Sequence, residues 1–281
     1  MTAPAAASSA GLRGPLLLVG CGKMGGALLE GWLACGLPPA EATVVEPDAG
    51  VRERLRGRGV AALAGPEELP GGGPAPAALV LAVKPQTMDA TVAAYREPAR
   101  RGALVLSIAA GKTIAGFERA FGAEAAIVRA MPNTPAAIGR GMTVLSANPR
   151  VTPAQRDLAT ALMGAVGGVE WVEDEELLHA VTALSGGGPA YVFLLIEALA
   201  RAGVASGLPA ELSTRLARAT VAGSGALADR SPEPAEVLRR NVTSPGGTTA
   251  EALRVLMAED GLQPLFDRAI AAAAARSREL A

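Results

Sequence analysis

The chain has 281 residues, half of them hydrophobic and only 3% aromatic, so it is long enough for two domains with aliphatic cores. Its 26 Lys and Arg balance 27 Asp and Glu, which excludes the basic surface that nucleic acids and anionic membranes attract. Two cysteines are too few for a disulfide framework and predict a cytoplasmic protein. Gly, Pro or charge interrupts every apolar run before the ~20 residues of a membrane span, so the expected partner is a small molecule.

The first half of the chain has the pattern of an α/β sheet. Short runs rich in Val, Leu and Ile alternate with segments of helical spacing between Leu16 and Ala147, which is typical of a parallel sheet. The expected strands are 16–19, 43–46, 79–83, 104–108, 126–129 and 143–145. The segment 65–76 is rich in Gly and Pro and is expected to be loop. We therefore place a sheet domain at 15–172, after a tail at 1–14 that we expect to be disordered.

The second half has a different periodicity. Apolar residues recur at three- and four-residue spacing, which predicts helices at 190–202, 210–228 and 264–279. Parts of these helices are apolar on more than one face, whereas a helix at a water-exposed surface has one polar face. We expect residues 173–281 to form an all-α domain that packs against another subunit.

A glycine-rich loop follows the first expected strand. It has G-x-G-x-x-G spacing and leads into a helical pattern, which is the context of a dinucleotide site; the alternative is a simple tight turn. The first glycine permits the turn, the second lets pyrophosphate approach the backbone, and the third packs the helix on the strand. N–H groups at the helix start would bind phosphate. The predicted cofactor residues here are Gly20, Cys21, Gly22, Lys23, Met24 and Gly25.

Glu46 ends the second expected strand, where a carboxylate commonly accepts hydrogen bonds from the adenosine ribose. A carboxylate would repel the 2′-phosphate of NADPH, which favours NADH. Arg52 and Arg54 follow closely and could compensate for this repulsion, so the choice between NADH and NADPH stays open. The alternative for Glu46 is a solvated carboxylate at a strand end.

Other expected strands end in small residues or in backbone that proline makes rigid. Doubly wound sheets bind ligands beyond the carboxyl ends of their strands, and a flat nicotinamide can lie close to such backbone. For each of these strand ends the alternative is turn chemistry alone. The further candidate cofactor residues are Ala82, Val83, Lys84, Pro85, Ile108, Ala109 and Ala110.

In chain order the segments GCGKMG, AVKP, SIAAG, RAMPNTP, LSGGGPAY and SPGGTTAEAL resemble the pyrroline-5-carboxylate reductase family, from about residue 15 to the C-terminus. The resemblance implies an α/β Rossmann domain with a doubly wound, mostly parallel sheet, followed by an all-α domain that forms homodimers, which can assemble into rings such as decamers. It also implies NAD(P)H-dependent reduction of L-1-pyrroline-5-carboxylate to L-proline, the last step of proline biosynthesis. Lys23 and Glu46 depart from the family's usual residues, so its usual NADPH preference is not carried over.

The segment 244–249 precedes a helical pattern, so its backbone N–H groups can form a site for a substrate carboxylate. By resemblance it is the substrate loop, in which the Thr249 hydroxyl is catalytic and reaches the imine nitrogen. The resemblance also implies that Asn241 lies near the cofactor of a neighbouring subunit. The substrate residues predicted are Ser244, Gly246, Gly247, Thr248, Thr249 and, by family position, Glu173. For Glu173 and Glu175 the alternative is solvated charge at a helix start.

Two other classes of function have to be weighed. A β-hydroxyacid-dehydrogenase-like oxidoreductase needs a lysine in its helical half, but no lysine follows Lys112. A nucleotide-binding scaffold or redox sensor without turnover would not need the SPGGTT loop. Ser185 lacks the partners of a hydrolase nucleophile, the single histidine, His179, is given no role, and no metal is expected.

Overall fold

The computed structural model describes residues 14–70 and 75–281, and the predicted tail lies outside these residues apart from Gly14. The chain divides into two compact units, a sheet unit of Met1–Gly186 with Ala274–Ala281 and a helical unit of Gly187–Ala273. The division predicted after residue 172 follows the last strand, at Trp171. The units part later because α7 (Leu177–Val181) packs against the sheet.

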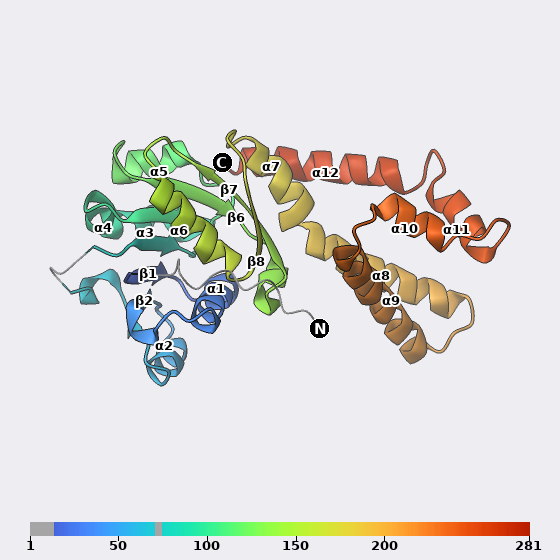
Figure 1. Cartoon of the computed structure of the whole chain (residues 1–281), viewed down its shortest axis with the longest axis horizontal. Coiled ribbons are helices and arrows are strands. Elements are labelled where there is room, and N and C mark those ends of the chain that lie inside the picture. Colours follow the sequence, from blue (N-terminus) through green and yellow to red (C-terminus); the bar gives the residue numbers. More distant parts are fainter. Residues whose placement is uncertain (1–13, 71–74) are drawn as a thin grey trace. The chain divides into compact units, whose positions relative to one another are not determined.

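The sheet unit contains one eight-stranded sheet with the order β3-β2-β1-β4-β5-β6-β7-β8 (Figure 1). All neighbouring strands pair in parallel except β6 and β7, which confirms the predicted doubly wound, mostly parallel sheet. The strand order reverses between β1 and β4, and such a reversal is where these sheets bind ligands. The strands are β1 (Leu16–Val19), β2 (Ala42–Val45), β3 (Ala61–Leu63), β4 (Ala78–Leu81), β5 (Leu104–Ser107), β6 (Ile127–Met131), β7 (Gly141–Ala147) and β8 (Gly167–Trp171).

Helices cover both faces of this sheet, and each layer has its own apolar core. Leu16 and Leu18 contribute to one core, while Leu17 and Val19 contribute to the other, because successive side chains of a strand point to opposite faces. Continuous apolar strands such as LLLV are therefore buried on both faces. One layer consists of α1 (Lys23–Ala34), α2 (Ala49–Arg56) and α6 (Pro153–Gly164), and the other of α3 (Pro85–Val92), α4 (Arg96–Arg100) and α5 (Ile114–Phe121).

The helical unit confirms the predicted all-α second half. Its α8–α9 pair is held by Ser213 Oγ, which donates a hydrogen bond to the Ala200 carbonyl at 2.7 Å. Tyr191 and Phe266 make an edge-to-face contact with ring centroids 6.5 Å apart. The helices are α8 (Gly188–Ala205), α9 (Ala210–Arg230), α10 (Ala235–Asn241), α11 (Thr248–Leu256) and α12 (Leu262–Glu279), whose last residues belong to the sheet unit.

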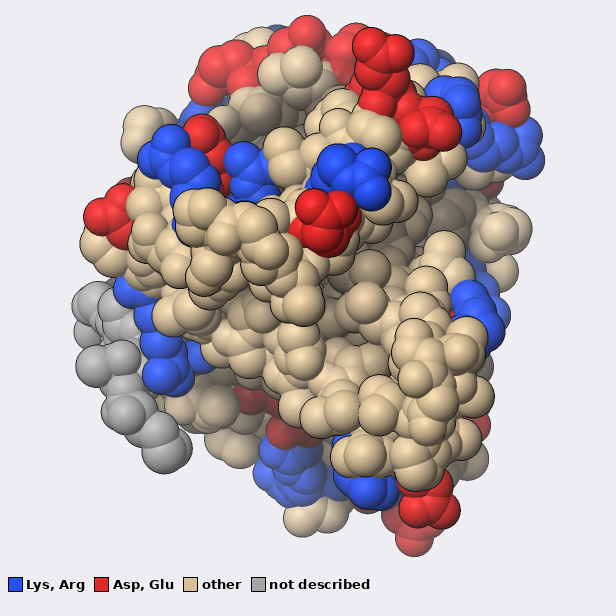
Figure 2. Space-filling view, turned by 90° about the vertical axis from the view of Figure 1, so that its right-hand side faces the viewer, with Lys and Arg blue, Asp and Glu red and all other residues tan. Residues whose placement is uncertain are grey.

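Large apolar side chains lie exposed on the helical unit, among them Phe193 at 59% and Leu194 at 57%. Uncharged side chains dominate the face seen in Figure 2. Within the described residues, Leu177–Ala205 is the one stretch long and apolar enough to cross a membrane by length and composition. An exposed apolar face is also what a subunit interface requires, so the absence of a membrane span stays a prediction.

Candidate active site

The glycine loop between β1 and α1 is shaped by close backbone contacts. Gly20 has φ +90°, and a Cβ there would lie 2.9 Å from the Ala82 carbonyl oxygen. A Cβ at Gly25 would lie 2.2 Å from the Gly20 carbonyl oxygen. At Gly22, by contrast, a Cβ would meet no atom within 4 Å. Packing therefore requires glycine at positions 20 and 25, whereas Gly22 leaves open space beside the backbone, as a pyrophosphate site needs.

The start of α1 adds the electrostatics of an anion site. The N-cap residue is Gly22, whose lack of a side chain leaves the first-turn N–H groups without a side-chain cap. Gly22 and Lys23 are exposed, while Gly25 is buried against the strand. Uncapped N–H groups and the positive end of a helix dipole favour phosphate. The loop thus fits the phosphates of a dinucleotide.

The Glu46 carboxylate hydrogen-bonds the glycine loop. Its Oε2 accepts a hydrogen bond from the Cys21 N–H at 2.7 Å, and its Oε1 accepts one from the Asp48 N–H at 3.0 Å. Arg52 Nη1 donates to the carbonyl oxygens of Glu46 and Pro47 at 2.8 and 2.6 Å. The end of β2 therefore presents a carboxylate and a guanidinium side by side, next to the phosphate loop.

The Cys21 thiol has a perturbed pKa in this setting. Burial, and then the neighbouring Glu46 carboxylate, raise the pKa of Cys21 from 9.0 to about 11. We expect its alkylation by iodoacetamide to rise tenfold per pH unit up to about pH 10, with roughly a hundredfold less thiolate at pH 8 than an unperturbed cysteine has. Peptide mass spectrometry of folded and urea-unfolded protein measures this. A plateau below pH 9 in the folded protein would contradict it.

The end of β4 lies beside the glycine loop, and the end of β5 lies beside that of β4. The Ala82 N–H donates to the Val19 carbonyl at 2.8 Å, and the Ile108 N–H donates to the Leu81 carbonyl at 3.1 Å. Lys84 precedes α3 as its N-cap, with Pro85 at the first helical position. The candidate residues of the loops after β1, β2, β4 and β5 thus meet at one edge of the sheet, and their cofactor contacts stay a prediction.

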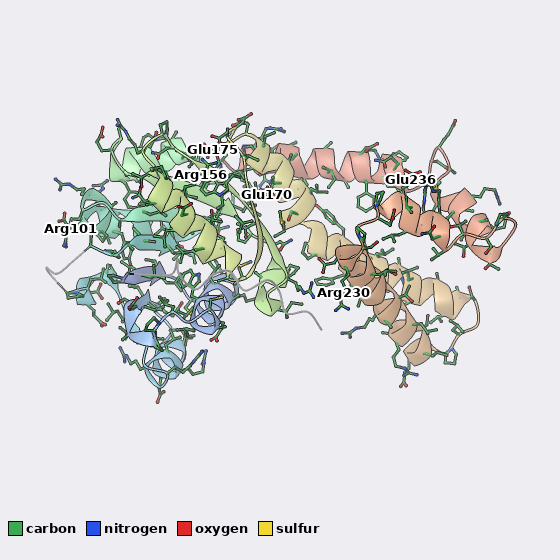
Figure 3. All side chains as sticks on the ribbon, in the orientation of Figure 1. Arg101, Arg156, Glu170, Glu175, Arg230 and Glu236 are labelled. Carbon is green, nitrogen blue, oxygen red and sulfur yellow. The ribbon has the colours of Figure 1, made fainter. Side chains whose placement is uncertain are left out.

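Two acidic residues after β8 lie in different environments. Glu175 is labelled near the start of α7 in Figure 3. Its Oε1 accepts hydrogen bonds from Arg129 Nη1 at 2.5 Å and from the Ile114 N–H at 2.8 Å, and only 5% of the Arg129 side chain is exposed. Glu173, with 88% of its side chain exposed, pairs with Arg156, whose guanidinium lies 4.1 Å from the centre of the Trp171 ring. Glu175 therefore joins β6, α5 and the start of α7 within the sheet unit. The substrate contact predicted for Glu173 stays a prediction.

Asn133 is a polar residue for which the sequence suggested no role. Its Nδ2 donates to Ser185 Oγ at 3.2 Å, and its Oδ1 accepts from the Met142 N–H at 2.9 Å. Ser185 lies in a π-helical turn, Thr182–Gly186, at the end of the sheet unit. The RAMPNTP motif was the only signal in the sequence that pointed to Asn133.

The SPGGTT segment forms the start of α11 in the helical unit. Gly246 has φ +69°, and the Gly247 N–H donates to the Ser244 carbonyl at 3.0 Å. Gly247 is the N-cap and offers no side chain, so the first-turn N–H groups of α11 are uncapped. Thr249 is exposed in this first turn. The geometry suits a carboxylate, with a hydroxyl next to it.

Asn241 ends α10, shortly before this segment, and is exposed. It lies in the helical unit together with the SPGGTT segment, while the glycine loop and Glu46 lie in the sheet unit. The candidate cofactor residues, Asn241 apart, and the candidate substrate loop are therefore carried by different units of the chain.

Comparison with known proteins extends these observations. Residues 175–280 match the family described as pyrroline-5-carboxylate reductase dimerisation, and residues 16–111 match NADP oxidoreductase, coenzyme F420-dependent. A pyrroline-5-carboxylate reductase of Pseudomonas aeruginosa is 40% identical over 275 residues, which cover 95% of this chain and 96% of the relative. One from Arabidopsis thaliana is 36% identical, with 93% and 94% covered.

Solved structures give the same picture. A pyrroline-5-carboxylate reductase from Coxiella burnetii superposes with a TM-score of 0.89 at 35% identity, covering 95% of this chain and 98% of that one. A Plasmodium falciparum pyrroline carboxylate reductase with NADP bound has a TM-score of 0.80 at 29% identity, with the same coverage.

Proposed function

Because the chain belongs to the pyrroline-5-carboxylate reductase family, we propose that it reduces L-1-pyrroline-5-carboxylate to L-proline with a reduced nicotinamide dinucleotide. The observation that carries the proposal is the uncapped first turn of α11 behind Gly246 and Gly247, with Thr249 exposed beside it. A scaffold without turnover needs no second anion site with a hydroxyl, and the relatives are named as reductases.

The cofactor is held by the edge of the sheet. N–H groups at the start of α1, beside the open space at Gly22, would bind its pyrophosphate, and Glu46 would accept hydrogen bonds from its adenosine ribose. The small residues after β4 and β5 leave room for the nicotinamide ring. When bound, the dinucleotide supplies the hydride for the reduction.

The substrate is held by the start of α11. The N–H groups of its first turn bind the substrate carboxylate, and the Thr249 hydroxyl hydrogen-bonds the ring nitrogen. The nitrogen takes up a proton from solvent, and the carbon of the C=N bond receives the hydride as this bond becomes C–N. A protonated cyclic imine is already an electrophile, so orientation contributes more than acid catalysis. This agrees with a chain whose one histidine, His179, is buried away from solvent.

Assembly and location complete the proposal. The family model that covers α8–α12 is one of dimerisation, and these helices expose large apolar side chains. The protein forms homo-oligomers through this unit; a homodimer, further assembly into a ring such as a decamer, and the cytoplasm as its location belong to the proposal.

The deciding experiment is absorbance-monitored oxidation of NADH and of NADPH by the purified protein, with and without pyrroline-5-carboxylate. Oxidation that depends on the imine supports the reductase. If the protein binds dinucleotide but oxidises neither cofactor, the result would favour a nucleotide-binding scaffold without turnover.

Thr249→Ala is expected to lower kcat by ~100-fold, because it removes the hydroxyl proposed to hydrogen-bond and orient the substrate nitrogen. Thr249→Ser, which keeps a hydroxyl, should stay within several-fold of the wild type. The Kd of the cofactor, measured by nicotinamide fluorescence, should not change in either variant. Loss of cofactor binding in Thr249→Ala would remove the assigned role.

Glu46→Gln is expected to raise the ratio of kcat/KM with NADPH to that with NADH by about tenfold, equivalent to ~1.4 kcal/mol. The amide oxygen can still accept from the Cys21 N–H, the amide NH2 no longer accepts from the Asp48 N–H, and the charge that would repel a 2′-phosphate is removed. Glu53→Gln, on the exposed surface of α2, is the matched control. An unchanged ratio for Glu46→Gln would show that this carboxylate does not contact the ribose.

A further inference from the structure

The last residues of α12 belong to the sheet unit, although the helix begins in the helical unit. Ala274 and Ser277 are buried there, at 9% and 7% exposure. His179 on α7, the one histidine of the chain, is 2% exposed, and its Nδ1 lies 2.8 Å from Ser277 Oγ. This buried hydrogen bond fixes the end of α12 on α7.

One turn further, the chain contacts the loop that follows β5. Gly111 is buried with φ +74°, and a Cβ there would lie 2.7 Å from the Leu280 carbonyl oxygen and 3.2 Å from the Leu280 Cβ. Gly111 comes directly after Ile108, Ala109 and Ala110, the residues assigned to the cofactor. The backbone of Leu280 therefore packs directly against this loop and limits its movement toward Leu280.

The same loop is fixed on its other side. Thr113 caps α5, its Oγ1 accepting from the Gly116 N–H at 3.1 Å, and the Ile114 N–H donates to Glu175. Lys112 Nζ pairs with Asp89 on α3 at 2.8 Å. The 108–111 loop is thus held at β5 and at α5, and its last residue, Gly111, packs against Leu280.

We infer that the last turn of α12 and Leu280, which follows it, form a positioning element for the nicotinamide half of the cofactor site. Leu280 places the 108–111 loop, and the His179–Ser277 hydrogen bond holds the end of α12 from which Leu280 extends. The inference rests on the proposed function. In a doubly wound sheet the two halves of a dinucleotide bind on opposite sides of the strand-order reversal. The adenosine side is that of β1 and β2, so the loop after β5 serves the nicotinamide side.

Gly111→Ala tests this contact, because the added methyl group must push the loop and Leu280 apart. Gly122→Ala is the matched control, since Gly122 also has positive φ, +100°, but a Cβ there would meet no atom within 4 Å. For each variant we would measure the Kd of NADH by fluorescence, the Kd of ADP-ribose by calorimetry, kcat, and Tm. ADP-ribose retains the adenosine and the pyrophosphate but lacks the nicotinamide.

Gly111→Ala should weaken NADH binding and lower kcat by ~10- to 100-fold while ADP-ribose binds within about twofold of the wild type. Gly122→Ala should leave the Kd of NADH, the Kd of ADP-ribose and kcat unchanged. Ser277→Ala, and a chain ending at Glu279, should also weaken NADH binding more than ADP-ribose binding, but by a smaller factor than Gly111→Ala.

Equal weakening of NADH and ADP-ribose in Gly111→Ala, or no change in either, overturns the inference. The proposed function is tested separately by the wild type. If the wild type shows no imine-dependent oxidation, the reductase is refuted. If Gly111→Ala nevertheless weakens binding of NADH and not of ADP-ribose, the positioning role still holds.

Discussion

Gly22→Ala is expected to leave the protein folded and to weaken dinucleotide binding at least ~10-fold. The Gly22 backbone, with φ −69° and ψ −161°, is open to alanine, and a Cβ would meet no protein atom within 4 Å. The cost in unfolding free energy should therefore stay below about 1 kcal/mol. The methyl group would instead occupy the space through which a pyrophosphate approaches the backbone.

Gly25→Ala is the contrasting variant of the same loop. Its Cβ would lie 2.2 Å from the Gly20 carbonyl oxygen, a contact that only a shift of α1 or of the loop can relieve. We expect the free energy of unfolding, from urea titration, to fall by ~1–3 kcal/mol. Tight NADH binding by Gly22→Ala would show that the cofactor does not approach this backbone. Equal destabilisation by the two variants would show that both positions are set by packing alone.

The sheet was largely predictable because its signals are local. A continuous apolar run followed by G-x-G-x-x-G predicted β1 and the glycine loop. In the second half of the chain, helical periodicity predicted α8, α9 and α12. Two strands were missed. β3 has only three residues and no β-branched residue, and β8 begins with Gly167 and Gly168, which have low strand propensity. Both form because a neighbouring strand offers hydrogen bonds.

Predicted strands also ran past their ends at Glu46, Ala82, Val83 and Ile108. The N–H groups of Glu46, Ala82 and Ile108 still donate to neighbouring strands, but these residues lie past the strand ends, at the edge of the sheet where the candidate cofactor residues gather. Strand propensity does not mark the residue at which a strand gives way to such a loop.

The candidate site was predictable only where its residues adjoin a motif. Glu175 and Arg129 are 46 residues apart, and Asn133 and Ser185 are 52 residues apart. Hydrophobic periodicity carries no information about such pairs. Periodicity also could not tell Glu173 from Glu175. The carboxylate that turns inward is the one that meets a cation, and Arg129, on another strand, supplies that cation.

That cation makes Glu175→Ala the variant with the largest expected effect on stability. The Arg129 side chain is 5% exposed and forms an ion pair with Glu175, so alanine would remove the carboxylate that neutralises this buried charge and accepts from the Ile114 N–H. We expect unfolding to become easier by about 3 kcal/mol, at the lower end for buried pairs because a quarter of Glu175 is exposed. Urea unfolding followed by circular dichroism measures this.

Glu173→Ala is its control, two residues away. It breaks an exposed pair with Arg156 and should cost less than about 0.5 kcal/mol. Glu175→Gln separates the two parts of the larger effect, because an amide oxygen still accepts from the Ile114 N–H but no longer neutralises Arg129. If charge dominates, Glu175→Gln should lie close to Glu175→Ala. If the hydrogen bond at the start of α5 dominates, the unfolding free energy of Glu175→Gln should lie close to that of the wild type. Equally small losses of unfolding free energy in Glu173→Ala and Glu175→Ala would mean that water reaches Arg129.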